Sequence, residues 1–340
     1  MYKRQKQCFK TEAPGHQGVD ANLFQIIGFL LAAYSVVAND SLQTLGTYLS
    51  SNRERTPKSL QMLFICSVAA AVMLIGWGLH PSGGGLADPA WGRLDNFPLP
   101  DNVNWVYLLP PIAVLALTQW GAPVSTSFLV LSAFVPKNSS SLLLHSLTGY
   151  LMAFAVALVV YGALMWLLER TVLCSPLQNR KVWLALQWIS TGWLWSQWLV
   201  QDMANIFVYL PRELNLSSMV AATLMLCVGL CVLVAIGGGP IQGVVRNKIN
   251  TGDLRSATVI DFLFGCVLFW KASISTFPLS TTWVFLGLLA GREIAIRWRL
   301  HPIDRQPLKT VLGSDVFKAG VGIVVSLAVA FAIQPLKALG

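Results

Sequence analysis

VANDSLQT, residues 37–44, places the carboxylate of Asp40 inside an apolar run that extends from about residue 22 to residue 50. A run of this length is long enough to cross a bilayer. An ionised side chain inside a membrane costs several kcal/mol unless water, an ion or a partner group compensates its charge. Asp40 is therefore a candidate functional residue.

A second stretch in the other half of the chain has the same character. VQDMAN, residues 200–205, places Asp202 inside the apolar run 182–211. Each carboxylate has amide side chains close to it in the sequence, which can bind either an anion or a cation. We therefore interpret the chain as a membrane transporter built from two repeats.

The composition supports a membrane protein. Of the 340 residues, 55% are hydrophobic and 11% are charged, whereas charged residues make up about 25% of soluble domains. The net charge of +9 comes from basic residues in short loops between apolar runs. Basic residues are distributed in this way in multi-pass membrane proteins, whereas a nucleic-acid-binding domain would gather them on one surface. Cys227 and Cys231 lack nearby histidines or paired carboxylates, so we expect no metal site there.

The apolar runs divide the chain into spans and two longer segments. The runs cover roughly 22–50, 59–80, 103–136, 142–168, 182–211, 217–237, 256–291 and 310–333. The runs 103–136 and 256–291 exceed the length of one span and are broken by proline and small hydroxylated residues. We predict that each of these two forms a re-entrant helical hairpin.

The two breaks have related sequences, GAPVSTSF at 121–128 and FPLSTTW at 277–283. A proline ends the incoming helix, and the hydroxyl groups that follow can cap the outgoing helix. Backbone N–H groups at that helix start then favour an anion. The hydroxylated residues of the two turns are Ser125, Thr126, Ser127, Ser280, Thr281 and Thr282.

The order of these motifs predicts an inverted repeat. Asp202 follows Asp40 by 162 positions, and Pro278 follows Pro123 by 155. Each half contains a broken helix with the carboxylate, a second helix, a hairpin and a third helix, and three full crossings per half invert the second half. The predicted divisions are a tail (1–21), a first repeat (22–168), a basic cytoplasmic linker (169–181) and a second repeat (182–340).

Loop charges agree with the inversion. The 51–58 loop is basic and its counterpart, 211–216, is balanced; the 81–102 loop is acidic, whereas its counterpart holds Arg246, Lys248 and Arg255 against one aspartate. The positive-inside rule then places the 169–181 and 292–309 loops in the cytoplasm and both termini outside. The basic first ten residues disagree with this orientation.

At this point the chain resembles the inorganic phosphate transporter (PiT) family, whose halves each carry a Gly-x-Asn-Asp-type segment and a Pro-Val-Ser-Thr-Thr-His-type segment. The matching segments are Ala38-Asn39-Asp40 with Gln43, Pro123-Val124-Ser125-Thr126-Ser127, Gln201-Asp202-Met203-Ala204-Asn205 and Pro278-Leu279-Ser280-Thr281-Thr282. Phe128 and Trp283 replace the family's histidines, Ala38 a glycine and Gln201 an asparagine. The resemblance covers nearly the whole chain.

The resemblance implies a symporter of inorganic phosphate, driven by sodium or protons, in which these segments line the ion and substrate sites. We expect the anion to contact Asn39, Ser125, Thr126, Ser127, Asn205, Ser280, Thr281 and Thr282. We expect the coupling cation near Asp40, Gln43, Thr44, Gln201 and Asp202. Apart from the coupling sodium ion or proton, no cofactor or metal is expected. The protein is expected to cross the cell membrane several times. A homodimer remains open.

Other interpretations remain open beside this one. Sulfate or another small oxyanion could replace phosphate as the substrate, and a non-transporting scaffold could have the same fold. An enzyme is not expected, since no serine nucleophile motif with a partnered histidine and no histidine-rich metal spacing is present. Lys271 either extends to the surface or pairs with one of the two aspartates, and His145 is expected to have a packing role.

Overall fold

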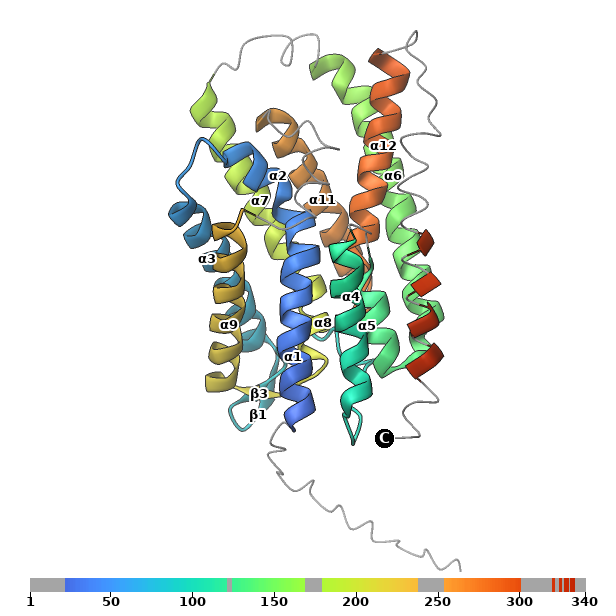
Figure 1. The fold of residues 1–340 in the computed structure, drawn as a ribbon. Helices are drawn as coiled ribbons and strands as arrows, with labels where there is room; N and C mark the ends of the chain where they lie inside the picture. Colours follow the sequence, from blue (N-terminus) through green and yellow to red (C-terminus); the bar gives the residue numbers. More distant parts are fainter. Residues whose placement is uncertain are drawn as a thin grey trace, which may run out of the picture.

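The computed structural model describes residues 22–120, 124–168, 179–237 and 254–300, with short helical pieces between 320 and 333. Within these residues the protein is a bundle of helices with one small sheet at one end (Figure 1). The predictions for the 1–21 tail, for Pro123 and for most of the 169–181 linker lie outside the described residues, as do Arg246 and Lys248.

The first carboxylate lies where a helix changes its winding. Helix α1, Leu23–Val36, begins with a reciprocal cap in which the Asn22 side chain accepts from Gln25 N at 2.9 Å and the Gln25 side chain accepts from Asn22 N at 2.6 Å. The helix widens into a π turn, Val37–Ser41, and continues as α2, Leu42–Asn52. The predicted interruption at Asn39-Asp40 is therefore this π turn, a feature common at functional sites.

The second carboxylate ends its helix. Helix α7, Arg180–Asp202, is followed after Met203 by the one-turn helix α8, Ala204–Phe207. The second helices of the two halves, α3 (Lys58–Leu79) and α9 (Leu216–Ala235), pack side by side (Figure 1). The two interrupted helices thus differ in form, because one bulges at its carboxylate and the other breaks after it.

The segment 103–136 folds as two short helices. A 3-10 turn, Trp105–Leu108, leads into α4, Leu109–Gln119, and α5 covers Thr126–Phe134. At a rise of about 1.5 Å per residue, the nine residues of α5 are far too short to cross a core of about 30 Å. After a short turn, Pro136–Asn138, the long helix α6 covers Ser139–Leu168.

The segment 256–291 has longer arms than the first hairpin. Helix α11 covers Leu254–Ile274 and α12 covers Thr281–Leu300, so each arm reaches the length of a membrane span. The turn between the arms nevertheless lies inside the protein, because Leu279 and Ser280 are buried. The N-terminus of α12 therefore lies in the interior of the bundle.

A small antiparallel sheet joins the two halves at one end of the bundle. Strands β1 (Pro81–Gly83), β2 (Leu86–Ala87) and β3 (Leu214–Asn215) pair in that order, with Ala87 opposite Leu214. Gly84 and Gly85 in the β1–β2 turn have φ values of 61° and 78°, which glycine adopts without strain. The sheet brings together the two loops that the charge pattern assigns to the outer face (Figure 1).

Two arginines fasten this end to the rest of the protein. Arg93 donates to the carbonyl of Ser275, just before the second hairpin turn, at 2.6 Å. Arg212 donates to the carbonyl of Phe97 at 2.9 Å through Nε. Burial lowers the pKa of each arginine to about 10, so both remain charged at neutral pH. The 88–97 loop is thereby held against both hairpin and sheet.

Length and composition identify five of the described helices as candidate membrane spans. They are Leu23–Ser41, Lys58–Leu79, Pro136–Ala163, Leu216–Ala235 and Leu254–Ile274. Large apolar side chains on their outer surfaces, such as Leu63 and Val228, are exposed, as expected for helices that face lipid. The predicted all-α, multi-pass membrane protein is confirmed.

Helices α6 and α12 pack at unusually close range through glycine. A Cβ at Gly287 would lie 2.3 Å from the carbonyl oxygen of Tyr150, and one at Gly291 would lie 2.3 Å from that of Phe154. The spacing Gly-x-x-x-Gly places both glycines on one face of α12, which is typical of closely packed membrane helices. This contact fixes the outgoing arm of the second hairpin to α6.

We predict that Gly287→Leu destabilises the protein by at least ~1–3 kcal/mol, because overpacking forces the two backbones apart. The measurement is the midpoint of thermal unfolding of detergent-purified protein. Gly162→Leu is the matched control, since a Cβ at Gly162 on α6 meets no atom within 4 Å. Equal midpoints for the two variants would contradict the predicted contact.

Candidate substrate and ion site

The π turn orients Asp40 into the bundle and leaves Asn39 beside it. Both side chains are buried, with Asp40 2% exposed. Ser41 and Thr44 bond back to carbonyls of their own helix, with Thr44 Oγ1 3.0 Å from the carbonyl oxygen of Asp40. These two hydroxyls donate to backbone carbonyl oxygens around the π turn. Thr44 therefore stabilises the backbone at Asp40.

The Asp40 carboxylate meets the second hairpin. Its Oδ1 accepts from Asn39 Nδ2 at 2.8 Å and lies 3.0 Å from the hydroxyl of Thr282. Asn39 Nδ2 also lies 3.4 Å from the hydroxyl of Thr126 on the first hairpin. Gln43 Nε2 donates to Asn39 Oδ1 at 3.1 Å. Asp40 thus contacts the second hairpin turn directly and the first hairpin turn through Asn39.

The Asp202 carboxylate meets the same two turns from the other side. Its Oδ1 accepts from Asn205 Nδ2 at 2.8 Å and from the Ser127 hydroxyl at 3.3 Å. Its Oδ2 accepts from the Thr281 hydroxyl at 2.5 Å. Asp202 is 1% exposed, so all of these contacts are protected from solvent.

The contacts of the two carboxylates correspond in detail. Ser127 stands in the first turn where Thr282 stands in the second, and each contacts the carboxylate of the opposite half. Each hydroxyl also contacts a carbonyl of the opposite turn: Ser127 lies 3.2 Å from Leu279 O, and Thr282 lies 3.0 Å from Val124 O. The two hairpin turns therefore touch one another between the two carboxylates.

Both outgoing hairpin helices begin at this point. Ser125 caps α5 by accepting from Phe128 N at 3.1 Å, and Ser280 caps α12 by accepting from Trp283 N at 3.3 Å. Serine in this position is a favoured helix cap. The caps satisfy one N–H group each, and the first-turn N–H groups of Thr126, Ser127, Thr281 and Thr282 have no partner within their own helices. Two helix N-termini, each favourable to an anion, converge here.

The site also contains oxygen atoms without donors. Among the described residues, four buried oxygens of the predicted site accept no hydrogen bond: Asp40 Oδ2, Gln43 Oε1, Gln201 Oε1 and Asn205 Oδ1. A buried acceptor without a donor costs about 1–3 kcal/mol. Carboxylate and amide oxygens are ligands of hard cations, so these four oxygens are of the type that would bind a sodium ion.

The predicted residues thus come together around the two hairpin turns, but Thr44 and Gln201 make other contacts than those expected, since Thr44 bonds to the backbone carbonyl of Asp40. Gln201 directs its amide nitrogen to the carbonyl of Leu268 at 3.4 Å and not to Asp202. Lys271 lies in the last turn of α11, is partly exposed, and pairs with neither aspartate in the described residues, which agrees with its extension to the surface. His145 Nδ1 lies 2.9 Å from the carbonyl oxygen of Ser141, and its ring stacks on Phe277. Packing accounts for His145.

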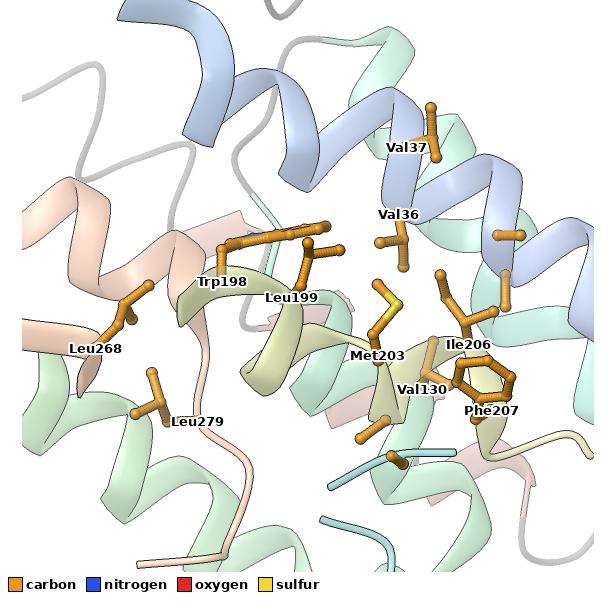
Figure 2. Close-up of a cluster of buried hydrophobic side chains, with 14 of the residues drawn as sticks. Val36, Val37, Val130, Trp198, Leu199, Met203, Ile206, Phe207, Leu268 and Leu279 are labelled. Atoms are coloured by element: carbon orange, nitrogen blue, oxygen red, sulfur yellow. The ribbon is translucent and has the colours of Figure 1, made fainter. Parts of the chain in front are cut away.

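An apolar cluster includes Met203, the residue that follows Asp202. Figure 2 shows side chains from α1, the π turn, α5, α7, α8 and α11 meeting around Met203, the residue after Asp202. Members labelled in the figure include Val36, Val130, Trp198, Leu199 and Leu268, all buried. Such a shell excludes water and strengthens electrostatic interactions within the site.

Sequence reasoning missed two groups of residues. Ser146 on α6 accepts from the backbone N–H of Ser280 at 3.2 Å and so supports the second turn. Asp261 on α11 is fully buried and contacts Thr47, Gln187 and Thr191. Like Asp40, Asp261 is a carboxylate inside an apolar run, here 256–291, and this pattern could have identified it.

Comparisons with known proteins agree with this architecture. No family model matches the chain, and no curated protein matches it. Among solved structures, one described as "The sodium-dependent phosphate transporter" aligns with a TM-score of 0.57 and 16% identity, over 92% of this chain and 98% of that one. At this identity the likeness shows the fold. The chain is a divergent multi-pass membrane protein with the fold of a sodium-dependent phosphate transporter, the fold implied by its resemblance to the PiT family.

Proposed function

We propose that the protein is a secondary transporter that carries inorganic phosphate together with a coupling cation. The observation that carries this proposal is the convergence of two helix N-termini and two buried carboxylates at the point where the hairpin turns touch. The similar solved structure is described as a sodium-dependent phosphate transporter, which supports phosphate as the substrate and sodium as the coupling ion.

The site chemistry requires both kinds of ion. Asp40 and Asp202 both contact the hairpin turns where these touch one another, so two charged carboxylates there would repel one another and would also repel a bare anion. Cations at the donor-free oxygens of Asp40, Gln43, Gln201 and Asn205 would neutralise this repulsion. The hydroxyls and first-turn N–H groups at Ser125–Ser127 and Ser280–Thr282 would then hold the anion. Binding of either ion is thereby made more favourable by the other, and this coupling is reciprocal, which supports transport of the two ions together.

Alternating access follows from the arrangement of the two halves. The matched contacts of Ser127 and Thr282 support an inverted repeat with boundaries at 22–168 and 182–340. In such transporters one repeat moves against the other around a central site. The acidic 81–102 loop faces outward and the basic 51–58 loop faces the cytoplasm in this proposal, with the cell membrane as the location.

The proposal is tested by uptake of labelled phosphate into proteoliposomes under a sodium gradient, a proton gradient or neither. We expect uptake under at least one gradient, and a lower rate for labelled sulfate. Faster sulfate than phosphate uptake would assign the protein to the other oxyanion. Absence of uptake together with absence of thermal stabilisation by either anion would favour a non-transporting scaffold, since a bound ligand at 100 times its Kd stabilises by about 2.7 kcal/mol.

A further inference from the structure

Asp261 forms a second buried polar cluster, separate from the paired carboxylates. It lies on α11 and is 0% exposed. Its Oδ2 accepts from Thr191 Oγ1 at 2.6 Å and from Gln187 Nε2 at 3.1 Å, both on α7, and its Oδ1 accepts from the Thr47 hydroxyl on α2. One carboxyl group thus joins a helix of the first half to two helices of the second.

The cluster continues toward one end of the bundle. Gln187 Oε1 accepts from Ser51 Oγ at 3.0 Å, and Ser51 Oγ accepts from Asn52 Nδ2 at 3.3 Å. Asn52 Oδ1 in turn accepts from the hydroxyl of Thr56 at 3.2 Å, and Thr56 is partly exposed in the loop after α2. A continuous line of polar side chains therefore connects Asp261 with solvent at the end of the bundle that holds the 53–57 loop.

The partners of Asp261 are all neutral. The charged and titratable side chains described on the helices that pack around Asp261 are Tyr48 on α2; His145, Tyr150 and Tyr161 on α6; Arg180, Lys181 and Asp202 on α7; Arg255, Cys266 and Lys271 on α11; and Arg292 and Glu293 on α12. None of these donates to Asp261 in the described residues, and Arg292 instead reaches Ser256 at 3.5 Å and lies over the Tyr161 ring at 5.6 Å. A lone carboxylate in a membrane protein interior must be neutralised by a proton or a cation.

The hydroxyl partners allow Asp261 to hold a proton. Thr47, Thr191 and Gln187 all donate to its oxygens, an arrangement that suits the charged form. A hydroxyl can also accept a hydrogen bond, so when Asp261 is protonated its O–H donates to the oxygen of one threonine, whose own hydroxyl then turns to another acceptor.

We propose that Asp261 is a proton-binding site that exchanges its proton with water admitted along the Gln187–Ser51–Asn52–Thr56 line, and that it links proton binding to the relative position of α2, α7 and α11. The inference rests on the proposed transport function. On release, the proton passes from the carboxyl group to water, giving a carboxylate and hydronium. The buried negative charge then favours a state in which water reaches the cluster, so the α2 contact loosens. Proton occupancy thereby biases the movement of one half against the other.

The test compares wild type with Asp261→Asn, which resembles the protonated carboxyl group in size and charge. In proteoliposomes we expect the variant to retain exchange of labelled for unlabelled phosphate within about twofold of wild type. We expect its response to an imposed pH gradient, and proton movement reported by an internal pH dye, to be lost. Equal pH-gradient responses in wild type and variant would overturn the proposal, as would loss of exchange and phosphate binding together, which would indicate a structural role.

A second measurement does not depend on transport. Infrared difference spectra recorded between acidic and alkaline pH should contain a protonated-carboxyl band that Asp261→Asn removes. Thr191→Val, which removes a donor to the charged form, should move the midpoint of that band to higher pH. An unchanged band in Asp261→Asn would overturn this inference while leaving phosphate transport intact. Absence of phosphate uptake with the band present would instead overturn the proposed function.

Discussion

Asp202→Asn is expected to reduce phosphate uptake by at least roughly 100-fold, the largest effect of any substitution considered. The three groups that contact this carboxylate, Ser127, Asn205 and Thr281, all present donors to it. Asparagine removes the charge and turns one acceptor into a donor that opposes them. Each hydrogen bond to a charged group contributes about 1.5–3 kcal/mol, and ~2.8 kcal/mol corresponds to a hundredfold change.

Initial rates in proteoliposomes measure this effect, with protein amount matched by purification. Asp101→Asn, in the exposed loop before α4, is the control and should transport at the wild-type rate. Asp40→Asn should resemble Asp202→Asn, because the two carboxylates make corresponding contacts. Uptake above about half the wild-type rate in Asp202→Asn would show that this carboxylate is not part of the site.

The second large effect is expected for cation dependence. Gln43→Met removes an amide oxygen that is buried without a donor, while keeping a side chain of similar length. If that oxygen binds the coupling cation, the cation concentration for half-maximal uptake should rise by about tenfold, equal to ~1.4 kcal/mol. The phosphate concentration for half-maximal uptake, measured at saturating cation, should change much less.

Gln197→Met serves as the control for Gln43→Met. Gln197 lies on α7 outside the site, where it is partly exposed and bonds only to Ser196 among the described residues. Its substitution should leave both half-saturation values unchanged. A rise in the phosphate value for Gln43→Met, with the cation value unchanged, would place Gln43 at the anion and would contradict the assignment of its oxygen to the cation.

The glycine contact and the Asp261 cluster illustrate the limit of sequence reasoning. Gly287 and Gly291 could be read as a Gly-x-x-x-Gly face, but their partner helix is α6, more than 130 residues earlier in the chain. Thr47, Gln187 and Asp261 are likewise separated by 74 to 214 positions. No local pattern specifies such pairings, because they depend on how helices cross.

The length of the second hairpin shows the same limit. The apolar run 256–291 predicts a break at Pro278, and the structure has its turn there. Whether the arms are short or span-length depends on which helices pack against them. The close approach of α12 to α6 and of α11 to α7 supports two long arms, whereas α5 ends after nine residues.

The sequence by itself indicated that the helices lie in lipid, and it identified the Asp40 and Asp202 motifs and the residue types around them, because apolar run length and isolated polar residues are local properties. It also identified the PiT resemblance from Asn39-Asp40 and the repeated Pro-x-Ser-Thr segments. Only the tertiary structure decided that each carboxylate binds the hairpin turn of the opposite half, that the turns touch, and that Asp261 joins the two halves. Those contacts arise from helix packing over long separations, where hydrogen bonding in a nonpolar interior permits few arrangements.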